Sequence, residues 1–301
     1  MKRVLSQSDF DRFAALSRDD NPIHCDPAFA RGTHFGATVA HGMFLYGLVC
    51  AALSRRIGAP WMALAQTLMF PAPTFAGDAV ETRLAERPVA IGAAAPPAAP
   101  GAIPERALPL RVFDVRVEVV RDGQAIGTAV GEALAALHPD AVRDPRLAPL
   151  MRANEAARVD GRPASGEEGP ATGDARAPAL HGIAPGMSAT AQRCFAEADL
   201  DEYADLCGDA NPLVRAGAAA RAFGLAGRMV PGPLLSGMFS DLLGTRLPGR
   251  GTGWMKQSLR FLRVVHAGET LQARVEVVCV RPDKQLVNLR STVRDASGHL
   301  V

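Results

Sequence analysis

The stretch SRDDNPIHCDPAFA, residues 17–30, is the part around which the chain is organised. It places a carboxylate, Asp19, five residues before an imidazole, His24. Between them Asn21-Pro22 interrupts any helix, because proline lacks an N–H and disfavours the helical conformation of the residue before it. A turn at this position can bring both side chains to one point. There, an acid and an imidazole can hold a water molecule and exchange protons near neutral pH.

The same residues also allow a purely structural interpretation. In it, Asp19 caps backbone amides where a helix ends, and His24 is an ordinary polar residue of the turn. The stretch by itself leaves both interpretations open. A second feature of the sequence favours the chemical one.

That feature is a tandem repeat. Residues 10–17 (FDRFAALS) align with residues 200–207 (LDEYADLC), and residues 19–24 (DDNPIH) align with residues 209–214 (DANPLV). The further matches are residues 41–45 (HGMFL) with 231–235 (PGPLL), Phe70 with Phe261, and Gly77-Asp78 with Gly268-Glu269. Chance could produce one such match but not the series in order, so the chain is a tandem duplication.

The two copies differ at the residues that matter most. The second copy keeps the acid, Asp209, and the Asn-Pro pair, but Val214 replaces His24. Valine cannot exchange a proton, so we expect chemistry that needs both groups only in the first copy. The first copy has Arg18 where the second has Gly208. We expect this change to be tolerated unless the backbone there needs a positive φ.

Two helices are predicted in the first copy. Ser8 with Asp11 resembles a capping box that opens a short amphipathic helix. The residues on its inner face are Phe10, Phe13, Ala14 and Leu16. Residues 40–57 are apolar nearly all round, which predicts a helix buried on most sides.

The motif at residues 17–24 resembles the Ser-Gly-Asp-x-Asn-Pro-(Ile/Leu)-His signature of MaoC-like dehydratases and (R)-specific enoyl-CoA hydratases, with Arg18 in place of the glycine. Residues 70–78 are similar to the family's Phe…Pro-Val…Gly-Asp segment. The resemblance implies an α+β fold, a double hotdog. Each unit is then a curved antiparallel sheet wrapped around one long apolar helix, here residues 40–57 in the first copy.

The predicted organisation has three parts. Residues 1–138 form an N-terminal hotdog repeat, residues 139–187 a Pro/Gly/Ala-rich linker, and residues 188–301 a C-terminal repeat with a degenerate site. A Pro/Ala-rich insertion at residues 92–108 is predicted to be a solvated loop. The last two strands of the first repeat join at Asp122-Gly123. The second repeat has no apparent counterpart of the final strand, so either the sequence is shortened or another segment of the chain fills that place in the sheet.

The resemblance also implies the roles of the site residues. Asp19 would act as the main base toward a water molecule, with His24 as its partner in binding that water and moving its proton. Asn21 would orient the pair. A backbone N–H near Gly42, at a helix N-terminus, would stabilise the enolate-like thioester oxygen. The predicted substrate-binding residues beside it are His41 and Met43. No metal site is predicted.

The implied activity is reversible hydration of a trans-2-enoyl-CoA, or dehydration of an (R)-3-hydroxyacyl-CoA, at one site per chain. No cofactor is expected beyond the coenzyme A that carries the substrate. Because single hotdog units usually pair, the duplication would build that dimer within one chain, and two chains could associate further. Two alternatives compete. One is a hotdog acyl-CoA thioesterase. The other is a non-catalytic acyl-thioester-binding protein, in which Arg18 distorts the turn or the short second repeat cannot fold.

The composition excludes several other classes. The 301 residues carry a net charge of +2, a near-balance that gives no reason to expect nucleic acid or an anionic membrane surface. No apolar run is long enough to span a bilayer. The five cysteines are scattered without CxxC spacing, which is typical of reduced thiols. The predicted location is therefore the cytoplasm.

Overall fold

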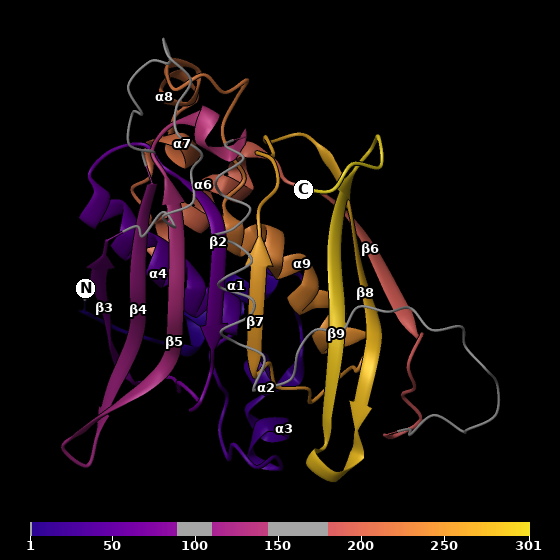
Figure 1. Ribbon diagram of the computed structural model, residues 1–301. Helices are drawn as coiled ribbons and strands as arrows, with labels where there is room; N and C mark the ends of the chain where they lie inside the picture. The colour runs from indigo at the N-terminus through magenta and orange to yellow at the C-terminus, as the bar shows by residue number, and fades with distance from the viewer. Residues whose placement is uncertain (1, 89–109, 144–179) are drawn as a thin grey trace.

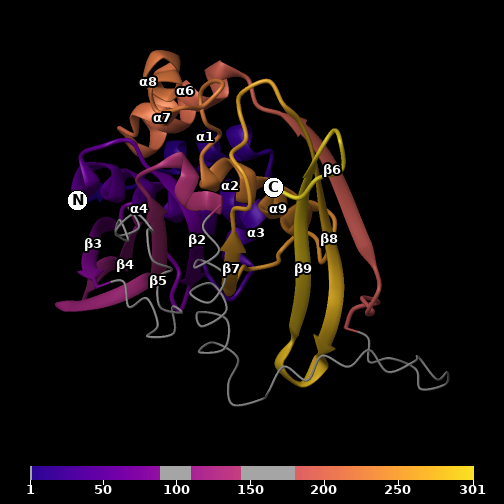
Figure 2. The ribbon, with the colours of Figure 1, turned by 45° about the horizontal axis from the view of Figure 1, so that its top comes forward.

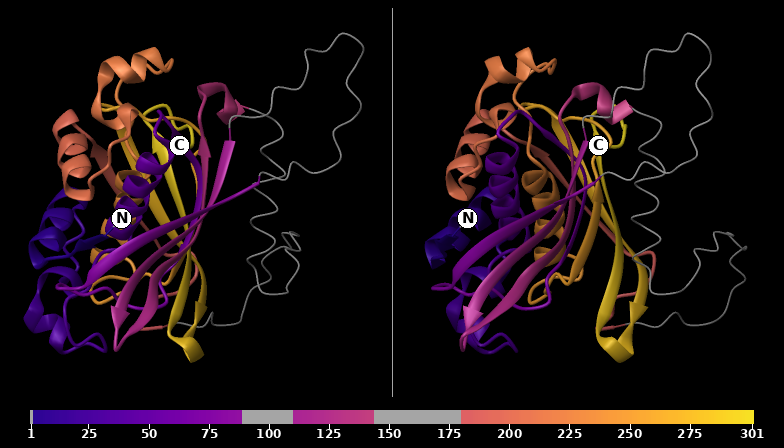
Figure 3. Two further views of the ribbon diagram at one scale, coloured as in Figure 1. Left: turned by 90° about the vertical axis from the view of Figure 1, so that its left-hand side faces the viewer. Right: turned by 60° about the vertical axis from the view of Figure 1, so that its left-hand side comes forward.

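The computed structural model describes residues 2–88, 110–143 and 180–301. The strands form a broad curved layer, and the long helices lie against one face of it (Figure 1; Figure 3). The predicted loop at residues 92–108 lies outside the described residues, as does most of the predicted linker. None of the described helices is both long and apolar enough to cross a membrane.

The first repeat carries four helices and five strands in its described part. In chain order these are β1 (Lys2–Val4), α1 (Gln7–Ser17), α2 (Pro22–Cys25), α3 (Pro27–Arg31), α4 (Gly42–Ile57), β2 (Met62–Met69), β3 (Ala79–Arg87), β4 (Leu110–Arg121) and β5 (Gln124–Ala136). A short 3-10 turn, η1 (Pro139–Arg143), follows β5.

The second repeat follows the same order. Its elements are β6 (Ser188–Cys194), α6 (Glu197–Cys207), α7 (Pro212–Arg215), α8 (Gly217–Ala222), α9 (Gly232–Thr245), β7 (Lys256–Arg260), β8 (Thr270–Arg281), η2 (Pro282–Lys284) and β9 (Leu286–Asp295). The helices and strands of the second repeat therefore follow one another in the order that the duplication predicts.

Helix α1 begins earlier than the sequence predicts. Its N-cap is Ser6, whose hydroxyl accepts from the backbone N–H of Asp9, while the Asp9 carboxylate accepts from the N–H of Ser6. The predicted box of Ser8 and Asp11 was wrong by two residues, because Ser6-x-x-Asp9 satisfies the same spacing one half-turn upstream. The predicted inner face is confirmed, since Phe10 and the other three residues are buried.

Helix α4 is the centre of the first repeat. Every residue from Met43 to Ser54 is buried, as the apolar run predicts. The helix packs against β3, β4 and β5, and it also contacts α6 and α9 of the second repeat. Because helices of the two repeats are in contact, each repeat can contribute side chains to the turn that carries the aspartate of the other repeat, Asp19 or Asp209.

The sheet continues from one repeat into the other. Six strands pair in the order β1-β3-β4-β5-β2-β7, so β7 of the second repeat joins β2 of the first, with Thr67 opposite Ser258. A second sheet has the order β6-β8-β9. Each repeat therefore has the curved antiparallel sheet and the long buried helix that the resemblance implies.

The two sheets are separate between β7 and β9 (Figure 1; Figure 2). In the first repeat β5 joins the corresponding strands, β2 and β4. In residues 180–301 no strand takes this place between β7 and β9. Leu300 and Val301 run along the edge of β9 that is not paired with β8, where the N–H of Val301 donates to the carbonyl of Val293.

Candidate active site

The turn after α1 directs Asp19 into the interior. Helix α1 ends at Ser17, and its C-cap, Arg18, has the left-handed conformation (φ 66°, ψ 13°), as does Gly208 in the second repeat (φ 72°, ψ 30°). This position therefore does have a positive φ, the one condition under which arginine was not expected to be tolerated. The chain nevertheless adopts this φ with a non-glycine residue. Beyond Arg18, the N–H of Asp19 donates to the hydroxyl of Ser17. Asp19 is left only 1% exposed.

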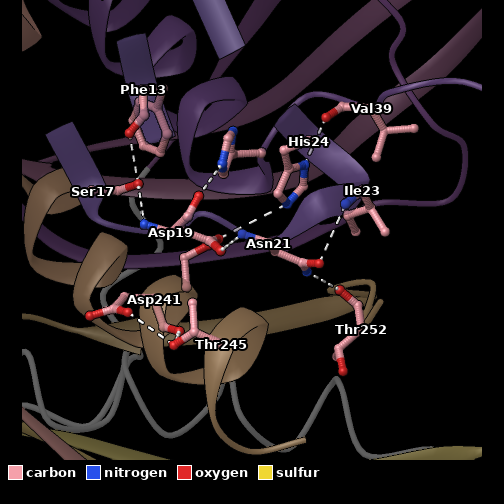
Figure 4. A network of polar contacts seen from close by, with 12 residues as sticks. Phe13, Ser17, Asp19, Asn21, Ile23, His24, Val39, Asp241, Thr245 and Thr252 are labelled. Atoms are coloured by element: carbon pink, nitrogen blue, oxygen red, sulfur yellow. Dashed lines mark hydrogen bonds and ion pairs between the residues drawn. The ribbon is translucent and has the colours of Figure 1, made fainter. Parts of the chain in front are cut away.

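Asn21-Pro22 then starts a new short helix. The Asn21 side chain caps α2 by accepting from the N–H of Ile23, and proline occupies the first helical position. One turn of α2 places His24 beside Asp19 (Figure 4). The sequence prediction that this turn brings the two side chains together is thus consistent with the geometry.

The distance from His24 Nε2 to Asp19 Oδ2 is 4.0 Å, too long for a direct hydrogen bond. The other ring nitrogen, Nδ1, lies 2.7 Å from the carbonyl oxygen of Val39. Because a carbonyl oxygen only accepts, Nδ1 must carry the hydrogen, and Nε2 presents its lone pair toward Asp19. One water molecule could donate to both the carboxylate and Nε2 across this gap.

Burial governs the protonation of both groups. It raises the pKa of Asp19, although His24 and the hydrogen bonds from Ser240 and the backbone of Asn21 favour the carboxylate. Burial, together with the adjacent His41, lowers the pKa of His24 to about 3. His24 is therefore a neutral imidazole at physiological pH, while Asp19 holds a proton more readily than an ordinary carboxylate does.

The second repeat supplies part of this site. The hydroxyl of Ser240, on α9, donates to Asp19 Oδ2. Gly244, one turn later, leaves room for the carboxylate, since a Cβ there would lie 2.4 Å from Asp19 Oδ1. The Asn21 side chain donates to the carbonyl of Thr252 and accepts from the N–H of Gly251. Sequence reasoning missed these residues; the only signal was that duplicated units should share an interface.

Gly42 lies where an oxyanion-binding N–H is expected. It is the first residue of α4, so its N–H has no acceptor within the helix. A Cβ at Gly42 would come within 2.8 Å of the Phe70 ring, so only glycine fits beneath this aromatic side chain. Gly42 is partly exposed, whereas its neighbours in α4 are buried. A substrate carbonyl could therefore reach this N–H.

His41 and Met43 lie on either side of Gly42 but point into the protein. The His41 ring stacks on His24 with ring centroids 3.7 Å apart, and its Nε2 lies 3.0 Å from the carbonyl oxygen of Asp19. Met43 is fully buried in the core. The sequence predicts that both residues bind substrate. Their buried positions are better suited to supporting the site than to contacting a substrate.

Asp19, His24 and His41 offer donor atoms within 4.8 Å of one another, which raises the question of a metal ion. The two imidazole rings are nearly parallel, at 26°. Since the lone pair of an imidazole lies in its ring plane, stacked rings direct their lone pairs side by side and not toward one ion. Nδ1 of His24 and Nε2 of His41 also already have backbone partners. The arrangement suits proton transfer better than metal binding.

Comparison with known proteins identifies the family of the chain. A family model described as "MaoC like domain" matches residues 1–93 and 179–297. The chain belongs to the MaoC-like domain family. The match covers both repeats, including the degenerate one.

Individual relatives of this MaoC-like chain match one part of it. It is 41% identical over 85 residues to a 3-hydroxybutyryl-CoA dehydratase of Methylorubrum extorquens, covering 28% of the chain and 54% of the relative. It is 36% identical over 115 residues to an (R)-specific enoyl-CoA hydratase of Aeromonas caviae, covering 38% of the chain and 86% of the relative. The chain thus spans about half the length of the first of these relatives.

Solved structures extend the likeness to the whole fold. A conserved hypothetical protein of Mycobacterium tuberculosis with a double hotdog fold superimposes with a TM-score of 0.65. The match covers 99% of this chain and 88% of that protein at 17% identity. The MaoC-like chain is therefore a double hotdog.

The second repeat of this MaoC-like chain has the same turn with other chemistry. Asp209 is 1% exposed and accepts hydrogen bonds from Ser54, from Tyr203 and from the N–H of Asn211. Burial raises its pKa. Val214 and Pro231 stand at the positions of His24 and His41, so this repeat has lost both imidazoles together.

Proposed function

We propose that the chain catalyses the reversible hydration of a trans-2-enoyl-CoA, or equally the dehydration of an (R)-3-hydroxyacyl-CoA, at one site in the first repeat. The observation that carries this proposal is the 4.0 Å gap between Asp19 Oδ2 and the unprotonated Nε2 of His24. It is supported by the N–H of Gly42, which has no acceptor within α4. The names of the two relatives supply the thioester class and, for the enzyme of A. caviae, the (R) configuration.

The proposed step begins with a water molecule between Asp19 and His24. His24 accepts one hydrogen bond from it and orients it, because an imidazole with a pKa of about 3 keeps no proton of its own. Asp19, whose pKa burial raises, removes the other proton as the water oxygen bonds to the β-carbon. The electrons of the C=C bond move toward the thioester oxygen, which accepts from the N–H of Gly42.

The proton then returns from Asp19 to the α-carbon, and the carboxylate is regenerated. The elements of water have been added across the double bond, and no charge is left on the protein. No electrons are gained from or lost to another molecule in these steps, so the proposal includes no redox cofactor, and it includes no metal. The dehydration of a 3-hydroxyacyl thioester is the same sequence reversed.

The test is a matched pair of substitutions assayed with crotonyl-CoA. Asp19→Asn is expected to lower kcat/KM by about 10⁴-fold, toward the upper end for general acid–base groups. Asp209→Asn, its counterpart in the second repeat, is expected to change it less than threefold. Hydration is followed by loss of the enoyl absorbance, and release of free thiol is followed in parallel. Thiol release without hydration would favour the thioesterase alternative, and silence in both assays would favour the binding protein.

The biological setting is part of the same proposal. A coenzyme A thioester would be the substrate, the cytoplasm the location, and two chains could form a homodimer. The near-neutral net charge of +2 is in keeping with a small-molecule substrate. Neither nucleic acid nor a membrane is proposed as a partner.

A further inference from the structure

A cavity lies at the degenerate turn of the second repeat. It encloses about 30 Å³, room for about two or three water molecules or for a short acyl chain in their place. The first repeat contributes Trp61 and Cys50 to its wall, and the second contributes Val214, Leu235 and Phe261. Its wall is therefore built by both repeats, as the Asp19 site is, and it is mostly apolar.

The cavity cannot perform the chemistry proposed for the first repeat. Val214 replaces the imidazole that would orient a water molecule. The carboxylate of Asp209 borders the cavity, but Ser54, Tyr203 and the N–H of Asn211 already donate to it. A carboxyl group held by three hydrogen bonds, with no imidazole beside it, offers no route for moving a proton to and from a ligand.

Two hydrogen-bond donors at the cavity are available to a ligand. Gly232 begins α9 as Gly42 begins α4, so its N–H has no acceptor within the helix. Arg263 also lines the cavity, and its buried Nε has no partner. The charge of Arg263 is already balanced by Glu269 and Asp295. The cavity therefore suits a neutral hydrogen-bond acceptor on an apolar group, not an anion.

We propose that this cavity is a second ligand site, which binds the acyl group and carbonyl of an acyl thioester without converting it. The choice of a thioester rests on the function proposed for the first repeat. The apolar and uncharged character of the ligand follows from the cavity itself. One chain would then hold two acyl thioesters, one at a reactive site and one at an inert site.

The chain contains a reporter for this site. Of its two tryptophans, Trp61 lines the cavity and is 3% exposed, while Trp254 lies elsewhere. In Trp254→Phe, emission comes from Trp61 alone. Butanoyl-CoA is the probe, because its saturated chain has neither a double bond to hydrate nor a hydroxyl to eliminate. We expect calorimetry to give two equivalents per chain and Trp61 emission to change as the cavity fills.

Two substitutions at one position test the location. Val214→Phe fills the cavity and is expected to reduce binding to one equivalent and to abolish the Trp61 response. Val214→Ala enlarges the cavity and is expected to keep two equivalents. One equivalent in the wild type with no Trp61 response would overturn the proposal, as would two equivalents in a folded Val214→Phe. If Val214→Phe does not fold, the wild-type stoichiometry and the Trp61 signal decide.

The same preparation separates this proposal from the hydratase proposal. A chain that hydrates crotonyl-CoA but binds one butanoyl-CoA would refute only the second ligand site. A chain that binds two equivalents and hydrates nothing would refute only the hydratase.

Discussion

The turns at Asp19 and Asp209 have the same backbone and different chemistry. Both carboxylates are 1% exposed, and each accepts from the N–H of the asparagine two residues later. Only the first turn faces an imidazole. The Asp-x-Asn-Pro part of the motif therefore serves the fold in both repeats, because it caps a helix and satisfies a buried carboxylate. The histidines are the part on which the proposed catalysis depends.

The supporting hydroxyls differ as well. Ser240 donates to Asp19, and Ser54 donates to Asp209. The offset of 190 residues that relates Asp19 to Asp209 relates Ser54 to Gly244, not to Ser240. The two turns have thus obtained equivalent hydrogen bonds from positions one helical turn apart, which shows that the buried carboxylate needs a donor but not a particular one.

Among the substitutions that test this comparison, the largest loss of activity should come from replacing His24 of the first turn with valine, the residue at the same position of the second turn. His24→Val is expected to lower kcat/KM by about 10²–10³-fold, because the water loses one of its two acceptors. The hydration assay measures this, and His34→Val, at an exposed histidine, serves as the control. A His24→Val chain that keeps more than a tenth of the activity would mean that Asp19 acts without the imidazole.

The next largest effect concerns the hydroxyl group that each repeat donates to the buried aspartate of the other. Ser240→Ala is expected to lower kcat by about tenfold to a hundredfold with little change in KM, because a hydrogen bond to a charged group contributes about 1.5–3 kcal/mol. Ser54→Ala removes the matching bond to Asp209 and is expected to lower the melting temperature without lowering kcat. If both variants lose the same activity, the hydroxyls act on stability and not on the reaction.

The pH dependence should follow Asp19 and not His24. Since burial raises the pKa of Asp19 above 3.8, kcat/KM is expected to rise with pH through a value above the ordinary carboxyl range. His24, with its pKa lowered to about 3, should add no limb near pH 6.5. Ser240→Ala removes a donor to the carboxylate, so the acid limb should move to higher pH. A limb near pH 6.5 that disappears in His24→Val would contradict this assignment.

The smallest effect concerns the residue before each aspartate. Arg18 has a positive φ, which costs a non-glycine residue about 1–2 kcal/mol, so Arg18→Gly should raise the free energy of unfolding by about 1 kcal/mol. Gly208→Ala should lower it by about the same amount, since no atom closer than 3.7 Å would meet the new Cβ. Thermal unfolding measures both. A stability loss in Arg18→Gly would mean that the guanidinium makes a stabilising contact.

Local patterns explain what could be predicted from the sequence. Proline at position 22 starts α2, and the apolar run of α4 has no alternative to burial. The duplication predicted the order of elements in the second repeat. The capping box was misplaced because two overlapping four-residue windows carry the same signal, and only the position of the first backbone hydrogen bond separates them.

The sequence by itself determined that the chain is a duplicated fold and that Asp19 and His24 lie close together, because a five-residue spacing across an Asn-Pro turn is a local property. Only the tertiary structure decided how that pair is supported. Ser240, Gly244, Gly251 and Thr252 are more than 200 residues away along the chain, and no local signal links them to Asp19 and Asn21. Helix packing between the repeats brings them together, and burial raises the pKa of the carboxylate and lowers the pKa of the imidazole.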